Sequence, residues 1–259
     1  MMMRINRRGA IAIGLLAGTM FAAGCSGAPP EAVDNMVEET VATDKGPAYA
    51  LITLPVNKTA DLPAQLAAAR DAGKVSDVVL MKSKPSPEGP LGFDSFAVVT
   101  FADGEAFSRW AATTASKLGA DVVVRRADLL VDARADKRDA KTAYVVNHYE
   151  ALVPPDDYAQ FTKAYISPNM DAQKKGGVMT GYAMYYERDP VSGANGRRAV
   201  LVKQFVDERA FLGSEKLKAG IKEELMRDPE WKRINDTKDS LRKDISSTLA
   251  LPVEMPPAR

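Results

Sequence analysis

The single histidine of the 259-residue chain, His148, is the first residue whose type suggests chemistry. It lies in the segment TAYVVNHYEAL (residues 142–152), directly after Asn147. Histidine can exchange a proton near neutral pH, but this role needs partners that orient the ring or shift its pKa. His148 and Asn147 are therefore candidate catalytic residues for proton transfer or substrate positioning. The alternative is a hydrogen-bonded strand histidine with no role in chemistry.

Tyrosines offer partners for this histidine. Alternate residues of a strand point to the same face, which puts Tyr144 and His148 together on the predicted strand. The segment TGYAMYYER (residues 180–188) likewise puts Tyr182 and Tyr186 on one face. If these faces meet, Tyr144, Tyr182 and Tyr186 are candidate ligand-binding residues in a pocket with apolar walls and a few polar groups. Such a pocket would take a small apolar or aromatic ligand; otherwise the tyrosines only pack in the core.

Several other chemistries lack the residues that they need. A zinc site normally uses three or four His, Cys or carboxylate ligands, and the chain contains one histidine and one cysteine. The sequence therefore predicts no metal site. It also contains no P-loop, dinucleotide-binding fingerprint or nucleophile elbow, and no serine has a motif that supports a catalytic triad.

Cys25, the only cysteine, lies at the end of an export signal. Three arginines precede an uncharged apolar run over residues 10–23, which is shorter than the roughly 20 residues that a membrane-spanning helix needs. The small residues Ala23 and Gly24 before Cys25 are typical of a lipoprotein signal peptide, here residues 1–24. We therefore expect lipidation of Cys25 and export to the bacterial cell envelope, with the folded part facing the periplasm or the exterior. The alternative is a free cysteine behind an ordinary cleavage site.

The composition that follows the signal limits the partners. Residues 25–46 are rich in acidic residues and proline and contain no aromatic residue, so we expect a flexible tether. Removal of residues 1–24 takes away three arginines and no acidic residue, which lowers the formal net charge from +1 to −2. A charge so close to zero gives no reason to expect nucleic-acid binding. The predicted partner is a membrane, reached through the lipid; self-association is left open.

The rest of the chain contains an internal repeat. The segment FADGEAF (residues 101–107) matches FVDERAF (residues 205–211) at four positions. Upstream, AYALITLPV matches AYVVNHYEA at its first two residues, and Thr53 aligns with His148. Two matched pairs in the same order indicate two copies of one unit. We assign repeat 1 to residues 47–134, the charged linker to residues 135–141 and repeat 2 to residues 142–255.

Each copy shows the same order of predicted elements, β-α-β-β-α-β. The strand segments are rich in β-branched and aromatic residues and are bounded by Gly, Pro and Asp. Acidic residues occupy helix-capping positions before the predicted helices: Asp61, Asp103, Asp156, Asp157 and Asp207. The charged run from Ser214 to Lys243 has apolar residues at helical spacing, so we expect an amphipathic helix over the second sheet, with a further helical segment from Pro229.

This arrangement resembles the dimeric α/β-barrel superfamily, in which two ferredoxin-like units place their sheets face to face. The resemblance implies an α+β fold of two tandem ferredoxin-like βαββαβ repeats with antiparallel sheets. Some members of the superfamily bind haem or oxidise aromatic substrates, and the haem-binding relatives carry their functional histidine on a helix. His148 lies on a predicted strand, and the helices after each strand pair contain no histidine, so we expect no haem and no other cofactor. The resemblance rests on element order and includes no catalytic motif.

Two hypotheses of function follow. The first is a non-enzymatic, membrane-tethered lipoprotein that acts as a binding or envelope-associated module, because no set of catalytic residues converges. The alternative is a cofactor-independent monooxygenase or another small-ligand enzyme that uses a pocket between the two sheets. The alternative predicts that His148 points inward beside an enclosed cavity.

Overall fold

The computed structural model describes residues 46–86, 90–135, 138–188 and 197–256. The first half contains β1 (Ala48–Leu54), α1 (Leu62–Asp71), β2 (Asp77–Ser83), β3 (Ser95–Phe101), α2 (Gly104–Thr113) and β4 (Val123–Asp132). The second half contains β5 (Ala143–Ala151), α3 (Pro155–Phe161), a π-helix (Thr162–Ile166), α4 (Ser167–Lys175), β6 (Met179–Glu187), β7 (Arg197–Phe205), α5 (Glu208–Leu212), α6 (Glu215–Leu225), α7 (Pro229–Thr237) and β8 (Arg242–Pro252). Each half follows the predicted order β-α-β-β-α-β.

The eight strands of the described chain close into one antiparallel barrel. The strand order is β1-β3-β2-β8-β5-β7-β6-β4, with β4 pairing back to β1. The sheets of the two halves join at two seams, β2 with β8 and β4 with β6. The predicted fold class is confirmed, and closure leaves neither sheet with an unpaired edge. That the halves are copies of one unit, with the boundaries given above, stays a prediction.

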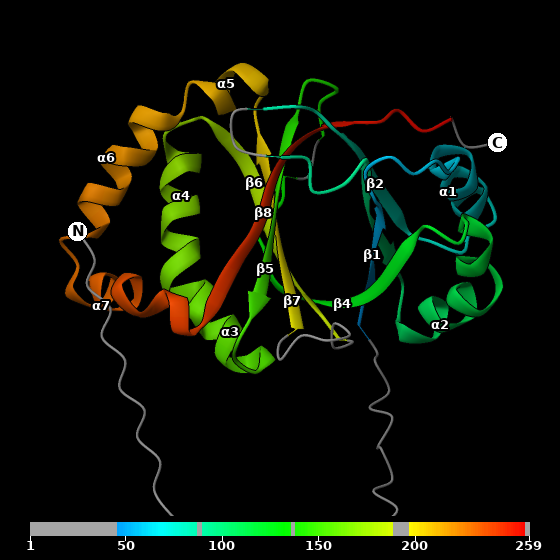
Figure 1. The fold of residues 1–259 in the computed structure, drawn as a ribbon, viewed down its shortest axis with the longest axis horizontal. Coiled ribbons are helices and arrows are strands. Elements are labelled where there is room, and N and C mark those ends of the chain that lie inside the picture. Colours follow the sequence, from blue (N-terminus) through cyan, green and yellow to red (C-terminus); the bar gives the residue numbers. More distant parts are fainter. Residues whose placement is uncertain (1–45, 87–89, 136–137, 189–196, 257–259) are drawn as a thin grey trace, which may run out of the picture. The chain divides into compact units, whose positions relative to one another are not determined.

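Helices cover the outer face of each sheet. In Figure 1, α1 and α2 lie on one side of the barrel, and α3, α4, α6 and α7 lie on the other. Each strand therefore has one face toward its helices and one toward the barrel interior, which explains why the strands are apolar on both faces. The interior core combines residues of both halves: Tyr49, Leu51, Met81, Phe93, Phe96, Val98, Ala127, Tyr144, Val146, Ala183, Tyr185, Val200, Val202 and Ala250.

Three of the predicted aspartate caps are confirmed. Asp103 and Asp207 each accept a hydrogen bond of 2.7 Å from the backbone N–H three residues later, at the start of α2 and α5. Asp61 does the same at α1, with a distance of 3.3 Å. The capping role predicted for Asp156 and Asp157 is wrong. Helix α3 begins at Pro155, so both carboxylates lie in its first turn. There their negative charges interact favourably with the positive end of the helix dipole.

The helical segment after β5 is longer than its counterpart in the first half. It runs without a break from α3 through the π-helix into α4, whereas α1 spans ten residues. Pro168, in the first turn of α4, has no backbone N–H to donate, and the helix widens to the π form in the five residues just before Ser167. π-Helical turns are rare and are found frequently at functional sites.

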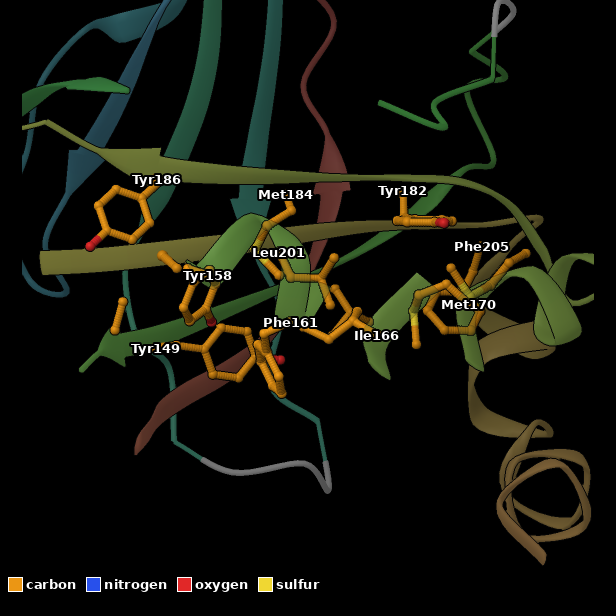
Figure 2. Packing of buried hydrophobic residues seen from close by; sticks show 14 of the residues in the cluster. Tyr149, Tyr158, Phe161, Ile166, Met170, Tyr182, Met184, Tyr186, Leu201 and Phe205 are labelled. Atoms are coloured by element: carbon orange, nitrogen blue, oxygen red, sulfur yellow. The ribbon is translucent and has the colours of Figure 1, made fainter. Parts of the chain in front are cut away.

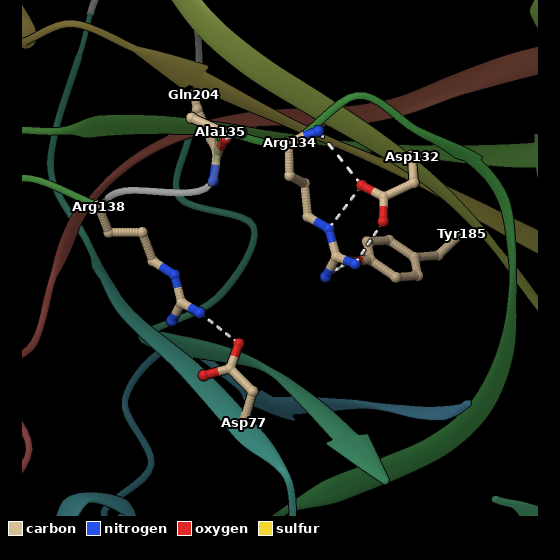
Figure 3. A network of polar contacts seen from close by, with 7 residues as sticks. All are labelled: Asp77, Asp132, Arg134, Ala135, Arg138, Tyr185 and Gln204. Atoms are coloured by element: carbon tan, nitrogen blue, oxygen red, sulfur yellow. Dashed lines mark hydrogen bonds and ion pairs between the residues drawn. The ribbon is translucent and has the colours of Figure 1, made fainter. Parts of the chain in front are cut away.

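Described residues of the connection between the two halves contact several strands (Figure 3). Arg134 makes two hydrogen bonds to the Asp132 carboxylate, at 2.8 and 2.6 Å, and a third of 3.3 Å to the Tyr185 hydroxyl. The backbone N–H of Ala135 donates to Gln204 Oε1 at 3.0 Å. Arg138 pairs with Asp77 of β2. These contacts attach the connection to strands of both halves.

The predicted signal peptide, the lipidation site Cys25 and the tether up to residue 45 lie outside the described residues. Within the described part of the chain, the helices are all too short or too polar to span a membrane.

Candidate functional site

His148 points into the barrel interior. Its ring makes edge contacts with Phe96 and Phe93 of the first half, with ring centroids 5.6 and 6.1 Å away. The ring Nδ1 lies 3.3 Å from the Ser246 hydroxyl, and only 7% of the residue is exposed. Burial, aided by the nearby charge of Arg198, lowers the pKa of His148 to about 4. The ring is therefore neutral at pH 7 and packs as part of the core.

Tyr144 shares the interior face with His148, as predicted, but Asn147 does not. Tyr144 is buried, and its burial raises the pKa of its hydroxyl. Asn147 alternates with His148 along β5 and therefore faces the helices, together with Val145 and Tyr149 of the helix-side core. The Asn147 Oδ1 atom is buried and has no hydrogen-bond partner among the described residues.

The predicted grouping of Tyr182 and Tyr186 with His148 is wrong. Both tyrosines belong to the helix-side core, as Figure 2 shows, and their hydroxyls donate to Asp171 Oδ1 at 3.2 Å and to the Val153 carbonyl at 2.9 Å. The reason is the pairing register across β7, which lies between β5 and β6. Its Val200 is paired with both His148 and Tyr185, so Tyr185 is the tyrosine of β6 that shares the interior face.

The barrel interior offers His148 a packed environment instead of a cavity. Fourteen buried side chains from both halves form the interior core, including Phe93, Phe96, Tyr144 and Tyr185. His148 is not among the residues that line four of the pockets formed by described residues. Among the described residues, the surroundings of His148 are therefore packed side chains.

A different pocket lies between the second sheet and its helices. It has a volume of about 150 Å³. Its walls come from β5, the π-helix, α4, β7, α7 and β8. We call it the Arg242 pocket, and its lining residues are Tyr149, Tyr165, Ile166, Asn169, Met170, Leu201, Lys203, Trp231 and Arg242.

Aromatic rings form one side of the Arg242 pocket. Tyr165 of the π-helix stacks on Trp231 of α7, with ring centroids 4.7 Å apart and planes at 26°. Trp231 Nε1 donates to the Tyr165 carbonyl at 3.0 Å, and the Tyr165 hydroxyl donates to Asn235 Oδ1 at 2.9 Å. Asp228 caps α7, and its Oδ1 accepts a hydrogen bond of 3.2 Å from the backbone N–H of Trp231. The wall is therefore held in place by hydrogen bonds to both of its rings.

The guanidinium of Arg242 forms the charged part of the pocket. It lies over the Tyr149 ring at 4.0 Å, and 12% of the Arg242 side chain is exposed. Burial raises the pKa of Tyr149 to about 12, although the positive charge of Arg242 opposes this shift. Burial raises the pKa of Tyr165 as well. Both phenols are therefore neutral at pH 7 and act as hydrogen-bonding groups, not as bases.

A β-bulge sets the direction of Arg242. His148 pairs with Ser246, but the next residue, Tyr149, pairs with Asp244, so Ile245 is an extra residue in β8. Because of this extra residue, the alternation of side chains along β8 shifts by one position at the bulge. Ser246 consequently contacts His148 in the interior, whereas Asp244 and Arg242 lie on the helix side with Tyr149. Sequence alternation alone would have placed Arg242 and Ser246 on the same face, which is why the pocket could not be predicted from the sequence.

The residues do not fit a haem group held by histidine. His148, the only histidine, lies in the packed interior, and the Arg242 pocket is too small for a porphyrin and has no histidine in its lining. No group of three potential metal ligands from His, Cys, Asp and Glu occurs in the described part of the chain. The expectation that the protein carries no cofactor stays a prediction.

Comparisons with known proteins address the fold. No protein-family model matches the sequence, and no curated protein matches it. The crystal structure of an anthrone oxidase-like protein aligns with a TM-score of 0.52 and 12% sequence identity, over 82% of this chain and 92% of that chain. This chain has the dimeric α/β-barrel fold. A candidate monooxygenase from Fusobacterium nucleatum aligns with a TM-score of 0.48 and 14% identity, over 81% of this chain and 93% of that one. At sequence identities this low, the similarity supports a shared fold and no shared function.

Proposed function

We propose that the protein binds a small aromatic molecule in the Arg242 pocket. The observation that carries the proposal is a preformed space between sheet and helices with stacked rings on one side and a nearly buried guanidinium on the other. Small-molecule sites usually combine apolar and aromatic walls with a few polar groups that fix orientation. A π-helix supplies Tyr165 and Ile166 to the pocket, and such turns occur often at binding sites.

The volume limits the size of the ligand. A cavity of about 150 Å³ accommodates a molecule the size of benzene, and this pocket has that volume. It is smaller than the roughly 300–1,000 Å³ of sites for drug-sized ligands. A single-ring compound therefore fits, with its face against Tyr165 or Tyr149.

Titration of the purified domain with phenol tests the proposal. Binding should be saturable by calorimetry, and Tyr165→Leu should weaken it several-fold, because an aromatic pair contributes about 0.5–1.5 kcal/mol. Tyr182→Phe is the matched control, since Tyr182 lies under the same helices but does not line the pocket. If neither phenol nor benzoate binds saturably, or if both variants weaken phenol binding equally, the pocket is not the binding site.

The location of the protein in the cell belongs to the same proposal. We propose that lipidated Cys25 and the tether of residues 25–46 hold the binding module at a membrane surface of the bacterial envelope. The sequence pattern before Cys25 supports this placement. Stable anchoring needs more than one acyl chain, which a lipoprotein modification would supply.

Oxidation of the bound aromatic is a second candidate function. The fold is shared with an anthrone oxidase-like protein, and Arg242 would stabilise a deprotonated phenol or enol, the electron-rich form that reacts with dioxygen. We place such a reaction in the Arg242 pocket and not at His148. Oxygen uptake with a single-ring hydroquinone, lost in Arg242→Gln and retained in His148→Gln, would support this function. Absence of oxygen uptake with the wild-type protein would leave only the binding function.

A further inference from the structure

We propose that the ligand of the Arg242 pocket is an aromatic carboxylate, and that its carboxylate group replaces Asp244 as the partner of Arg242. This inference rests on the proposed binding function and names the class of ligand. It follows from the contacts of the Arg242 guanidinium, the charges of the pocket and the position of Asp244.

The Arg242 guanidinium lacks a close anionic partner among the described residues. It carries five N–H donors; its side chain interacts with the neutral hydroxyls of Tyr149 and Tyr158, and its ion-pair contact is Nε to Asp244 Oδ1 at 3.4 Å. Its other neighbours are the faces of the Tyr149 and Phe161 rings, at 4.0 and 5.6 Å. A buried charge is costly unless it is paired and hydrogen-bonded. Neutral hydroxyls and one long contact compensate this charge only in part, so a carboxylate that enters the pocket would be a stronger partner for Arg242.

The charges of the lining favour an anion. Arg242 and Lys203 both line the pocket, and no carboxylate is among the described residues that do. The Asn169 amide and the Tyr149 hydroxyl add further groups that can donate a hydrogen bond to a carboxylate. Arginine binds carboxylates through two parallel N–H···O bonds, a geometry that also fixes the plane of the group. An aromatic acid places its carboxylate coplanar with a ring that the aromatic wall can hold.

Asp244 lies where it would compete with such a ligand. Its side chain is 75% exposed, and its contact with Arg242 is long and involves a single oxygen. Solvent exposure makes a pair of this kind weak. A ligand carboxylate inside the pocket would meet Arg242 with less water around it and would form the stronger pair. Asp244 then acts as a surrogate partner that leaves when the ligand binds.

Calorimetric titration with benzoate, benzamide and sulfate tests this inference. Benzoate and benzamide have the same ring, but only benzoate carries a charge at pH 7. We expect benzoate to bind at least about tenfold more tightly than benzamide, since hydrogen bonds to charged groups are the strong ones. Sulfate at the same concentration should not displace benzoate, because it offers no ring to the aromatic wall.

Two variants separate the roles of the residues. Arg242→Gln should weaken benzoate binding much more than benzamide binding and so remove the preference for benzoate, and a circular dichroism spectrum confirms that this variant is folded. Asp244→Asn changes an exposed residue, so we expect this variant to fold like the wild-type protein. It should bind benzoate several-fold more tightly and bind benzamide with unchanged affinity. The first variant therefore tests whether Arg242 binds the ligand carboxylate, and the second tests whether that carboxylate replaces Asp244.

The outcomes distinguish this inference from the binding function beneath it. Equal affinities for benzoate and benzamide, with saturable binding of both, would leave the binding function in place and overturn the carboxylate assignment. Unchanged benzoate binding in Asp244→Asn would overturn the exchange of partners. Displacement of benzoate by sulfate would show that the site binds anions in general, and would overturn the assignment to an aromatic carboxylate. Absence of binding for both aromatic compounds would overturn the proposed function itself.

Discussion

The protonation state of His148 follows from its surroundings. The ring lies among Phe93, Phe96 and the Ser246 hydroxyl, where a positive charge would be poorly solvated. Arg198 adds a repulsive charge. The neutral ring of His148 therefore packs with the aromatic residues of the barrel interior.

We predict a pH-dependent loss of stability that depends on His148. The pKa is about 4 in the folded protein and near 6.5 in the unfolded chain. Between these values the unfolded chain binds the proton and the folded protein does not, so stability falls as the pH drops from about 6.5 to about 4. The loss from this residue is at most about 3 kcal/mol.

Urea denaturation of wild type and His148→Gln at pH 7, 5 and 4 measures this effect. The difference in free energy of unfolding between pH 7 and pH 4 should be smaller in the variant, because glutamine does not titrate. The same pH dependence in both proteins would show that other groups cause the loss.

At the scale of single elements, aspartate caps decide where helices begin. Asp103 and Asp207 adopt nearly identical extended backbone conformations and bond the same N–H position of their helices. This equivalence agrees with the matched segments FADGEAF and FVDERAF. Capping was predictable because the interaction joins residues three positions apart and depends on no distant contact.

We predict that Asp103→Ala lowers the free energy of unfolding by about 1 kcal/mol, since the N–H of Ala106 loses its acceptor. Asp103→Asn should stay close to wild type, because asparagine caps helices about as well as aspartate. Thermal unfolding of the three proteins provides the comparison. A loss of stability in the asparagine variant as large as that in the alanine variant would point to the charge of Asp103 instead of its cap.

At the scale of the whole molecule, one barrel joins the two halves, and the connection between them crosses near β6. Gly181 of β6 lies under this connection: a Cβ atom there would be 2.5 Å from the Ala135 nitrogen and 2.8 Å from the Ala133 carbonyl oxygen. It would also lie 2.5 Å from Gln204 Oε1, which accepts the hydrogen bond of Ala135. A side chain at this position would therefore displace the contacts seen in Figure 3.

We predict opposite effects of the same substitution at two glycines. Gly181→Ala should lower the free energy of unfolding by about 1–3 kcal/mol through steric overlap. Gly220→Ala should raise it by about 0.5–1 kcal/mol, because Gly220 lies inside α6 with no atom near its Cβ position and alanine favours the helix. Chemical denaturation gives both values. A neutral Gly181→Ala would mean that the connection moves aside without cost.

We also predict that membrane association depends on Cys25. In a bacterial host, full-length protein should incorporate labelled palmitate and fractionate with membranes, whereas Cys25→Ser should do neither, because serine cannot form the thioether to the lipid. Benzoate binding should be the same in both, since the Arg242 pocket lies far along the chain in the folded part. Palmitate incorporation in the serine variant would contradict the assignment of the lipidation site.

The amino-acid sequence by itself determined the order of elements, three of the aspartate caps and the burial of both strand faces. These features depend on neighbours within a few residues, through hydrogen bonding and the period of side-chain direction. It also determined that His148 and Tyr144 share a face, because β5 alternates regularly up to His148.

Only the tertiary structure decided which faces meet. The pairing register through β7 put Tyr182 and Tyr186 on the opposite face from His148. The bulge at Ile245 turned Arg242 toward Tyr149, and α7 brought Trp231 to the π-helix. Strand order and bulges arise from pairing between distant segments, so the local pattern of residues does not reveal them. The candidate site is built from these long-range contacts, which explains why the sequence predicted the fold but did not predict the Arg242 pocket.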